Sequence, residues 1–255
     1  MIPTDLVTWM LVFTRCSAML AIFPVFSTSY IPVQLRVALG ALLAYFIAAT
    51  LPPLAVAGLT IWGLIGLMAM EACVGLLLGF VGRILFYALD AAGNVMATEM
   101  GLMLATDFNP LSNARTDAPA VILNFLAMTL FLSLDLHHWF LLGLQRTYSF
   151  VPIGGAHLSA AMLSDVVERT GSLFLIAVQI AAPVIAVSFI ITMVFAVLGR
   201  AVPQMNVFTE SFAFRTMAGL IVFGLTLQLM AQHITNYLHR LPEDVLRVAQ
   251  LIGAG

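Results

Sequence analysis

Three side chains that could bind a metal or move a proton lie close together in the segment LFLSLDLHHWFLL, residues 130–142. They are Asp135, His137 and His138, and large apolar residues surround them. A metal ion needs three or four ligands in space. Because adjacent residues on a helix point about 100° apart, His137 and His138 are poorly placed to share one. We therefore expect hydrogen bonding at a helix end, or an interfacial anchor with Trp139, and no metal site.

Other catalytic patterns are not found in the sequence. It contains no Ser-His-Asp spacing, no glycine-rich phosphate loop and no HExxH helix. Cys16 and Cys73 lie inside apolar runs without metal-ligand spacing, which favours two small buried residues over a disulfide. We expect a protein that is not an enzyme and that binds no cofactor.

Two charges lie where lipid would be expected. Arg15 is in the middle of the first apolar run and Glu71 is in the middle of the third. An ionised group at the centre of a bilayer costs about 2.5–3.5 kcal/mol, so such groups usually have a partner. Arg15 and Glu71 are a possible buried ion pair that fixes the docking of two helices. The alternatives are that the two residues do not contact each other, or that they belong to an ion or proton path.

A polar stripe follows the second charge along the chain. Its members are spaced four, three, four and four residues apart, and they are Arg83, Tyr87, Asp90, Asn94 and Thr98. On a helix this spacing gives one narrow face, whereas Glu99 points the other way. Polar groups on an apolar helix must be covered by other helices or line a wet cavity. The stripe therefore predicts a contact with another subunit or, less favoured, a pore wall.

The composition indicates a membrane protein. Of 255 residues, 62% are hydrophobic and 9% are charged, against about 25% charged in soluble domains. The mean hydropathy is +1.07. The net charge is −2 and all ten cations are arginines, so no basic patch points to nucleic acid.

A helix needs about 20 apolar residues to cross a bilayer. Such helices must position the charged and polar side chains described in the preceding paragraphs. The apolar runs are 6–26, 37–51, 60–82, 84–105, 121–143, 172–198 and 212–233. Run 37–51 is short for a crossing. The nearly continuous stretch 60–105 would measure about 70 Å, so it either turns back near Gly79–Arg83 or extends beyond the bilayer. Residues 241–255 predict a short amphipathic helix with Pro242 near its first turn. The chain is expected to be one all-α membrane unit.

The polar segment GLMLATDFNPLSNARTDAPAV, residues 101–121, separates two of these runs. Pro110 and Pro119 disfavour helix at the residues before them. Asp107 and Asn109 are typical turn formers. Flexible methionines precede the segment. These features predict a mobile segment, with an ordinary exposed loop as the alternative.

Several longer motifs occur in an order that resembles a known family. They are FPVFSTSYIPVQLRVALG at 23–40, EACVGLLLGF at 71–80, DAAGNVMATEMGLMLA at 90–105, LFLSLDLHHWFLLGLQRTYSFVPIG at 130–154, APVIAVSFI at 182–190 and GRAVPQMNVFTESFAFRTMAGL at 199–220. The most specific part is Pro203, Gln204, Met205, Asn206, Val207 and Phe208. Over roughly residues 10–235 the chain resembles the FliR/SctT family, the R-type or T-type subunit of the type III secretion export apparatus. It departs from the family pattern at Leu136, where a glycine is common, and at 209–215, where a proline is missing.

The resemblance implies a fold and a set of partners. It implies long helical hairpins, with residues 1–170 similar to a P-type subunit and 171–255 similar to a Q-type subunit. One copy would complete a helical assembly with P-type and Q-type subunits around a channel, beside the B-type and A-type export apparatus proteins. Unfolded protein substrates would pass through, and membrane lipid would surround the assembly. The loop 106–122 would be a plug, carried mainly by Thr106, Asp107, Phe108, Asn109, Pro110, Leu111, Ser112, Asn113, Ala114 and Arg115.

The expected function is therefore that of a structural, pore-forming subunit of the bacterial type III protein export gate, on the flagellar branch. The expected location is the bacterial inner membrane, as a multi-pass protein of the flagellar basal body. One alternative is the injectisome branch of the same family. Another is a secondary ion or solute transporter with an ion path through Arg15, Glu71, Asp90 and Asp135, although no internal repeat is found.

Overall fold

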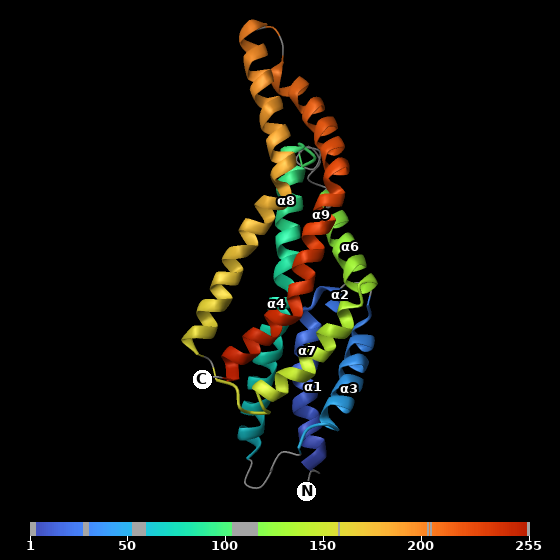
Figure 1. Ribbon diagram of the computed structural model, residues 1–255, viewed down its shortest axis with the longest axis vertical. Helices are drawn as coiled ribbons and strands as arrows, with labels where there is room; N and C mark the ends of the chain where they lie inside the picture. Colours follow the sequence, from blue (N-terminus) through green and yellow to red (C-terminus); the bar gives the residue numbers. More distant parts are fainter. Residues whose placement is uncertain are drawn as a thin grey trace. The chain divides into compact units, whose positions relative to one another are not determined.

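The computed structural model describes residues 4–27, 31–52, 60–103, 117–157, 159–202, 204 and 206–253. Within these ranges the regular structure is helical and no strand occurs. Figure 1 shows the helices, which are α1 (Thr4–Ile22), α2 (Pro24–Ser27), α3 (Val33–Ala48), α4 (Ile61–Glu99), α6 (Ala118–Ser133), α7 (Leu136–Phe150), α8 (Ala160–Ala201) and α9 (Val207–Gly253). The predicted all-α class is confirmed.

Three helices are long and apolar enough to cross a membrane. They are α4, α8 and the part of α9 from Thr209 to Gly253, and the bent pair of α6 and α7 would make a fourth crossing if it counts as one span. Helix α3 has only 16 residues. It falls short of the roughly 20 residues that a straight crossing needs. Length and composition therefore identify a multi-pass membrane protein.

The chain divides into two compact units, which several helices join. The first unit comprises Met1–Ile84, Leu132–Thr170 and Leu238–Gly255, and the second comprises Leu85–Phe131 and Gly171–Tyr237. Each unit has buried apolar side chains of its own. Among the largest are Leu11, Phe23, Leu78 and Phe140 in the first unit, and Leu89, Met96, Leu123 and Phe131 in the second.

Small residues bring α1 and α4 together in the first unit. A Cβ atom on Gly75 would overlap the carbonyl oxygen of Arg15, and one on Gly79 would lie 2.8 Å from the carbonyl oxygen of Met19. Glycines four residues apart lie on the same face of a helix. Their lack of a side chain lets two backbones approach closely, as in membrane helix pairs generally. The close crossing positions the middle of α1 directly against the middle of α4.

The second unit contains a hairpin of α8 and α9. Near its turn, a Cβ atom on Gly199 would lie 2.6 Å from Val207 Cγ2. Further along, the Tyr237 hydroxyl donates a hydrogen bond to Gln179 Oε1 at 3.4 Å. Residues 171–201 and 207–237 therefore run antiparallel and side by side, as the orange and red ribbons in Figure 1 show.

Helix α4 corrects one of the expectations for residues 60–105. The helix is continuous over 39 residues, so the hairpin near Gly79–Arg83 is wrong. It also ends at Glu99 rather than near 105. Gly101 has φ +74°, and Leu102 N donates a hydrogen bond to the carbonyl oxygen of Ala97 at 2.9 Å. Glycine adopts this left-handed conformation without strain, and it ends the helix in the manner of a Schellman motif.

Other predicted boundaries also change. Run 121–143 divides into α6 and α7 at Leu134-Asp135, and Asp135 has φ 56°. Residues 241–253 are the end of α9, with Pro242 inside the helix, so the separate short helix is wrong. Helices α8 and α9 are longer than their apolar runs, because helix continues through polar residues that hydropathy excludes.

Candidate functional site

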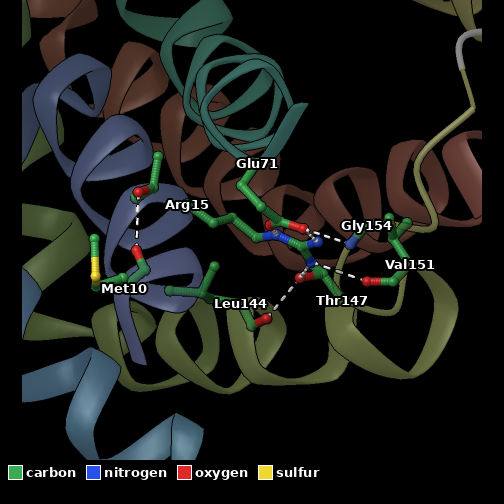
Figure 2. A network of polar contacts seen from close by, with 8 residues as sticks. Met10, Arg15, Glu71, Leu144, Thr147, Val151 and Gly154 are labelled. Atoms are coloured by element: carbon green, nitrogen blue, oxygen red, sulfur yellow. Dashed lines mark hydrogen bonds and ion pairs between the residues drawn. The ribbon is translucent and has the colours of Figure 1, made fainter. Parts of the chain in front are cut away.

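A buried ion pair lies at the centre of the first unit. Figure 2 shows the Arg15 guanidinium extending from α1 to the Glu71 carboxylate of α4. Arg15 Nε donates to Glu71 Oε2 at 2.6 Å, and Arg15 Nη2 donates to Glu71 Oε1 at 3.1 Å. Both side chains are fully buried. The predicted pairing of these two charges is confirmed, and it is bidentate, the geometry in which arginine binds a carboxylate most strongly.

Further hydrogen bonds to the pair come from α7 and the turn after it. Arg15 Nη1 donates to Thr147 Oγ1 at 3.4 Å and to the carbonyl oxygen of Val151 at 3.1 Å. Gly154 N donates to Glu71 Oε1 at 3.0 Å (Figure 2). The Arg15 guanidinium also stacks over the Tyr148 ring, with 4.1 Å from Cζ to the ring centroid. Such a network ties α1, α4 and α7 together through one side chain.

This closed arrangement favours the structural interpretation of Arg15 and Glu71 over an ion path. A buried charge is tolerated when it is paired and its remaining hydrogen bonds are made, and both conditions hold here. Sequence reasoning did not identify Thr147, Val151 or Gly154 as partners. Two of the three contribute through their backbone, so residue type and spacing give no signal for them.

The polar stripe on α4 is divided between the two units. In the first unit, Arg83 Nη1 donates to the carbonyl oxygen of Ile22 at 3.2 Å. In the second, Asn124 Nδ2 of α6 donates to Asp90 Oδ1 at 2.6 Å. Asn94 and Thr98 donate to carbonyl oxygens one turn earlier in α4. Part of the stripe is thus bonded within the chain, and its role as subunit contact or pore wall stays a prediction.

Most of the predicted plug loop, including Thr106 to Arg115, lies outside the described residues. Asp117 is described, and α6 begins at Ala118 with Pro119 in its first turn. Proline is well tolerated there because its missing N–H would have no partner in the helix. The last five residues of the loop 106–122 are therefore helical, whereas the plug itself stays a prediction.

The family motif at 203–208 follows α8 in the sequence and reaches into the start of α9. Pro203 and Met205 lie outside the described residues, and Gln204 is exposed in the turn. Asn206 precedes α9, and its Oδ1 accepts a hydrogen bond from Thr209 N at 3.4 Å. This is the position and bond of an N-capping residue. Val207 and Phe208 then begin α9.

The histidine pair is placed differently from our expectation. The His137 and His138 rings lie 4.1 Å apart, centroid to centroid. Their ligand atoms and a carboxylate oxygen of Asp135 all lie within 4.8 Å of one another. The expected divergence is wrong because the two side chains in the first turn of α7 lean toward each other. Asp135 ends the turn before α7, as expected for a residue at a helix end, but its side chain makes no capping hydrogen bond.

An ion-pair cluster that sequence reasoning missed lies elsewhere in the first unit. Arg169 Nε of α8 donates to Asp165 Oδ2 at 2.6 Å, and Arg169 Nη1 lies 2.6 Å from Asp244 Oδ1 of α9. Arg247 Nε lies 3.3 Å from Asp165 Oδ1. The cluster fastens the start of α8 to the end of α9. Its signal was the spacing of Asp165 and Arg169 by four residues, which places them on one helix face.

Large apolar side chains remain exposed along α8 and α9. In the most apolar window of each helix, 28% of the residues are buried for α8 and 11% for α9. The exposed side chains include Phe174, Val178, Phe189, Met193 and Val197 of α8, and Met217, Leu220, Ile221, Leu225 and Leu229 of α9. We call these residues the α8–α9 apolar face. A surface of this kind requires lipid or protein to cover it.

These observations define a class, that of all-helical multi-pass membrane proteins in which an internal ion pair joins the helices. The sequence profile of the family described as "Bacterial export proteins, family 1" matches residues 6–241, and the chain belongs to that family.

Proteins named "Flagellar biosynthetic protein FliR" are similar over nearly the whole chain. The one from Pectobacterium carotovorum is 28% identical, over 95% of each chain. The one from Escherichia coli K12 is 26% identical, over 93% of this chain and 92% of its own. The one from Caulobacter vibrioides is 29% identical, over 89% of this chain and 90% of its own. The predicted family resemblance is confirmed.

Proposed function

We propose that this chain is a structural, pore-forming subunit of the flagellar type III export gate in the bacterial inner membrane. The observation that carries the proposal is the family match over residues 6–241. The named relatives from three bacteria are all flagellar proteins, which supports the flagellar branch over the injectisome alternative.

The lengths of the helices indicate that other proteins cover part of this subunit. Helices α4, α8 and α9 have 39, 42 and 47 residues, about twice the roughly 20 that one crossing needs. Within the second unit, exposed large apolar residues on α8 extend from Phe174 to Leu198. At 1.5 Å per residue this distance is about 36 Å, whereas the hydrocarbon core measures about 30 Å. Protein partners would cover the apolar surface that lies beyond the lipid.

The proposed partners are P-type and Q-type export-gate subunits, with the B-type and A-type export apparatus proteins nearby. In this proposal residues 1–170 take a P-type position and residues 171–255 a Q-type position, and one copy of the chain completes the assembly. The hairpin of α8 and α9 supports the second assignment because its exposed faces are apolar on both helices.

The loop 106–122 is proposed to close the channel to small ions until an unfolded substrate enters. Its support comes from the sequence, since Pro110 and the turn-forming residues around it disfavour continuous helix. The methionines Met96, Met100 and Met103 precede it, and Met96 and Met100 are buried at the end of α4. Thioether side chains adapt to different neighbours, which suits a contact that must open and close again.

The transporter alternative gains no support from the charges proposed for it. Arg15 and Glu71 are buried and bonded to each other, and Asp90 accepts a hydrogen bond from Asn124. The closed ion pair leaves no open carboxylate at Glu71 for an ion to use.

The experiment is deletion of the coding gene in its own bacterium, with the gene restored on a plasmid as control. We expect no flagellar filament and no secreted filament or hook protein in the deletion strain, and recovery of both with the plasmid. Normal filaments in the deletion strain would contradict the proposed function.

A further inference from the structure

The start of α7 carries a group of side chains to which the proposed function assigns no role. Asp135, His137 and His138 offer one carboxylate oxygen and two ring nitrogens, all within 4.8 Å of one another. All three residues belong to the first unit. The carboxylate and His138 are well exposed on this chain, with 74% and 67% of their side-chain areas uncovered by its own residues.

Within the described residues the ligand atoms of this group make no hydrogen bond, although Asp135 and His138 are close enough to form an ion pair when the imidazole is protonated. The Asp135 side chain does not cap α7, and its Oδ1 lies 3.7 Å from His138 Nδ1, too far for a hydrogen bond. His137 Nδ1 is buried and finds no hydrogen-bond partner in the described part of the chain. A buried polar atom without a partner is costly and needs an explanation. A metal ion bound to His137 Nδ1 would supply the partner that this buried atom lacks.

The backbone also presents the carboxylate to the histidines. Asp135 has φ 56° and ψ 22°, a left-handed conformation that aspartate adopts more readily than most residues. His138 N donates to the carbonyl oxygen of Asp135 at 3.1 Å, which closes the turn. At this turn the carboxylate oxygen and the imidazole ligand atoms lie within 4.8 Å of one another.

We propose that Asp135, His137 and His138 bind a divalent transition-metal ion of the zinc class, with water at any remaining position. One carboxylate and two imidazoles form a nitrogen and oxygen ligand set that such ions prefer, whereas magnesium and calcium favour oxygen alone. Bond lengths near 2.0–2.1 Å place the ligand atoms of a tetrahedral site about 3.3 Å apart. Closing from 4.8 Å requires only rotation of side chains, two of which are exposed.

The bound ion would hold the first turn of α7 in one conformation. It would fix the left-handed residue Asp135 and both rings at once. The same helix carries Thr147 and Tyr148 of the Arg15 network, so the metal would stabilise an element that positions the ion pair. The proposed role is structural.

The test is zinc binding to the full-length chain in detergent micelles, purified through an affinity tag that contains no histidine. We expect one equivalent of zinc per chain by titration calorimetry and by elemental analysis after dialysis. Replacing both histidines, His137→Asn with His138→Asn, should abolish this binding. The matched control replaces two other exposed histidines, His233→Asn with His239→Asn, and should retain it.

A milder variant, Asp135→Asn, keeps the shape of the side chain and its tolerance of the left-handed conformation. It should weaken zinc binding by about tenfold or more, because loss of a ligand exceeds the effect of losing an outer partner. Equal loss of zinc in the control pair, or no stoichiometric zinc on the unmodified chain, would overturn the proposal. Either result would leave the proposed export function intact.

Discussion

At the scale of single residues, Arg15 joins α1, α4 and α7 in the first unit. Its guanidinium bonds to Glu71, Thr147 and Val151 and stacks on Tyr148. The cost of burying a charge is offset only while this set of partners is complete. The pair should therefore behave as a unit in which loss of either member leaves the other charge exposed to an apolar interior.

Replacing one member of the pair should destabilise the protein severely. Arg15→Ala or Glu71→Ala should each lower the free energy of unfolding by about 3–5 kcal/mol, because an unpaired buried charge remains. The measurement is thermal unfolding of the purified chain in detergent. Arg247→Ala is the control, since its side chain is 67% exposed and its ion pair should be worth no more than about 1 kcal/mol.

The double replacement sharpens this prediction. Arg15→Leu combined with Glu71→Leu removes both charges, so it should cost less than the sum of the two single leucine changes. If the effects of the single changes simply add, Arg15 and Glu71 do not act as a pair.

At the scale of helices, close crossings position the network. Gly75 and Gly79 bring α4 against α1 at the level of Arg15 and Met19, and Gly93 brings α4 against Ala120 of α6. These glycines matter for their missing side chains rather than for their backbone freedom, because all three lie inside a regular helix. The bidentate pair of Arg15 and Glu71 depends on this close approach.

A larger residue at the crossing should push the two helices apart. Gly75→Val should destabilise the chain by roughly 1–3 kcal/mol or more, because its Cβ would overlap the backbone at Arg15. Gly66→Val is the matched control, since a Cβ at Gly66 of the same helix meets no atom within 4 Å. Comparison of the two melting temperatures gives the result. Equal effects of the two changes would show that helix propensity, rather than the crossing, sets the cost.

The end of α9 is held by the cluster around Arg169. Arg169→Ala should remove its bonds to Asp165 and Asp244 and loosen residues 238–253 from the start of α8. Hydrogen exchange measured by mass spectrometry should show faster exchange in these residues. We expect a change equivalent to about 1.5–3 kcal/mol, typical of hydrogen bonds to charged groups. If hydrogen exchange in residues 238–253 did not change, the apolar contacts of α9 alone would be enough to hold its end in place.

Hydrophobicity predicted the fold class and the existence of the helices, but not where they end. A continuous apolar sequence is compatible with one helix of 39 residues and with two helices that form a hairpin. Hydropathy therefore does not decide between these two structures for residues 60–105. The ends of α4 and α6 depend on Gly101 and Asp135, whose backbone conformations are local and are not visible in a hydropathy pattern.

The sequence also predicted only some of the contacts in the candidate site. The pairing of Arg15 with Glu71 followed from the cost of burying either charge alone. The contribution of Val151 and Gly154 did not, because backbone groups carry no sequence signal. The proximity of the two histidine rings depends on side-chain rotation at the start of a helix, which residue spacing does not determine.

At the scale of the whole molecule, the chain combines a well-bonded interior with apolar surface that it does not cover itself. In the most apolar windows of α8 and α9, only 28% and 11% of the residues are buried within the chain. In the proposed assembly, neighbouring subunits cover the α8–α9 apolar face. Residues on that face should therefore be close to partner chains, whereas buried residues of the same helices should not.

A photo-reactive amino acid in place of Leu225 or Val197 should cross-link to a P-type or Q-type subunit, because these side chains are 77% and 68% exposed. The same probe at Val184, which is fully buried, should give no partner adduct. The products can be identified by mass spectrometry from cells that express the whole export apparatus. Adducts with lipid alone at the exposed positions would assign the face to the bilayer.

The plug proposal concerns the channel rather than the subunit alone. Deletion of residues 110–118 should leave the assembly intact but increase the passage of small ions through the resting gate. Conductance of the purified complex in planar bilayers measures this. Unchanged conductance would count against a plug in this loop.

The central claim is that one copy of this chain assembles with P-type and Q-type subunits into the export gate. The most direct measurement is native mass spectrometry of the complex purified through a tag on this chain after co-expression with both partners. We expect a stable complex that contains both partners and a single copy of this chain. A stable monomer that associates with neither partner would contradict it.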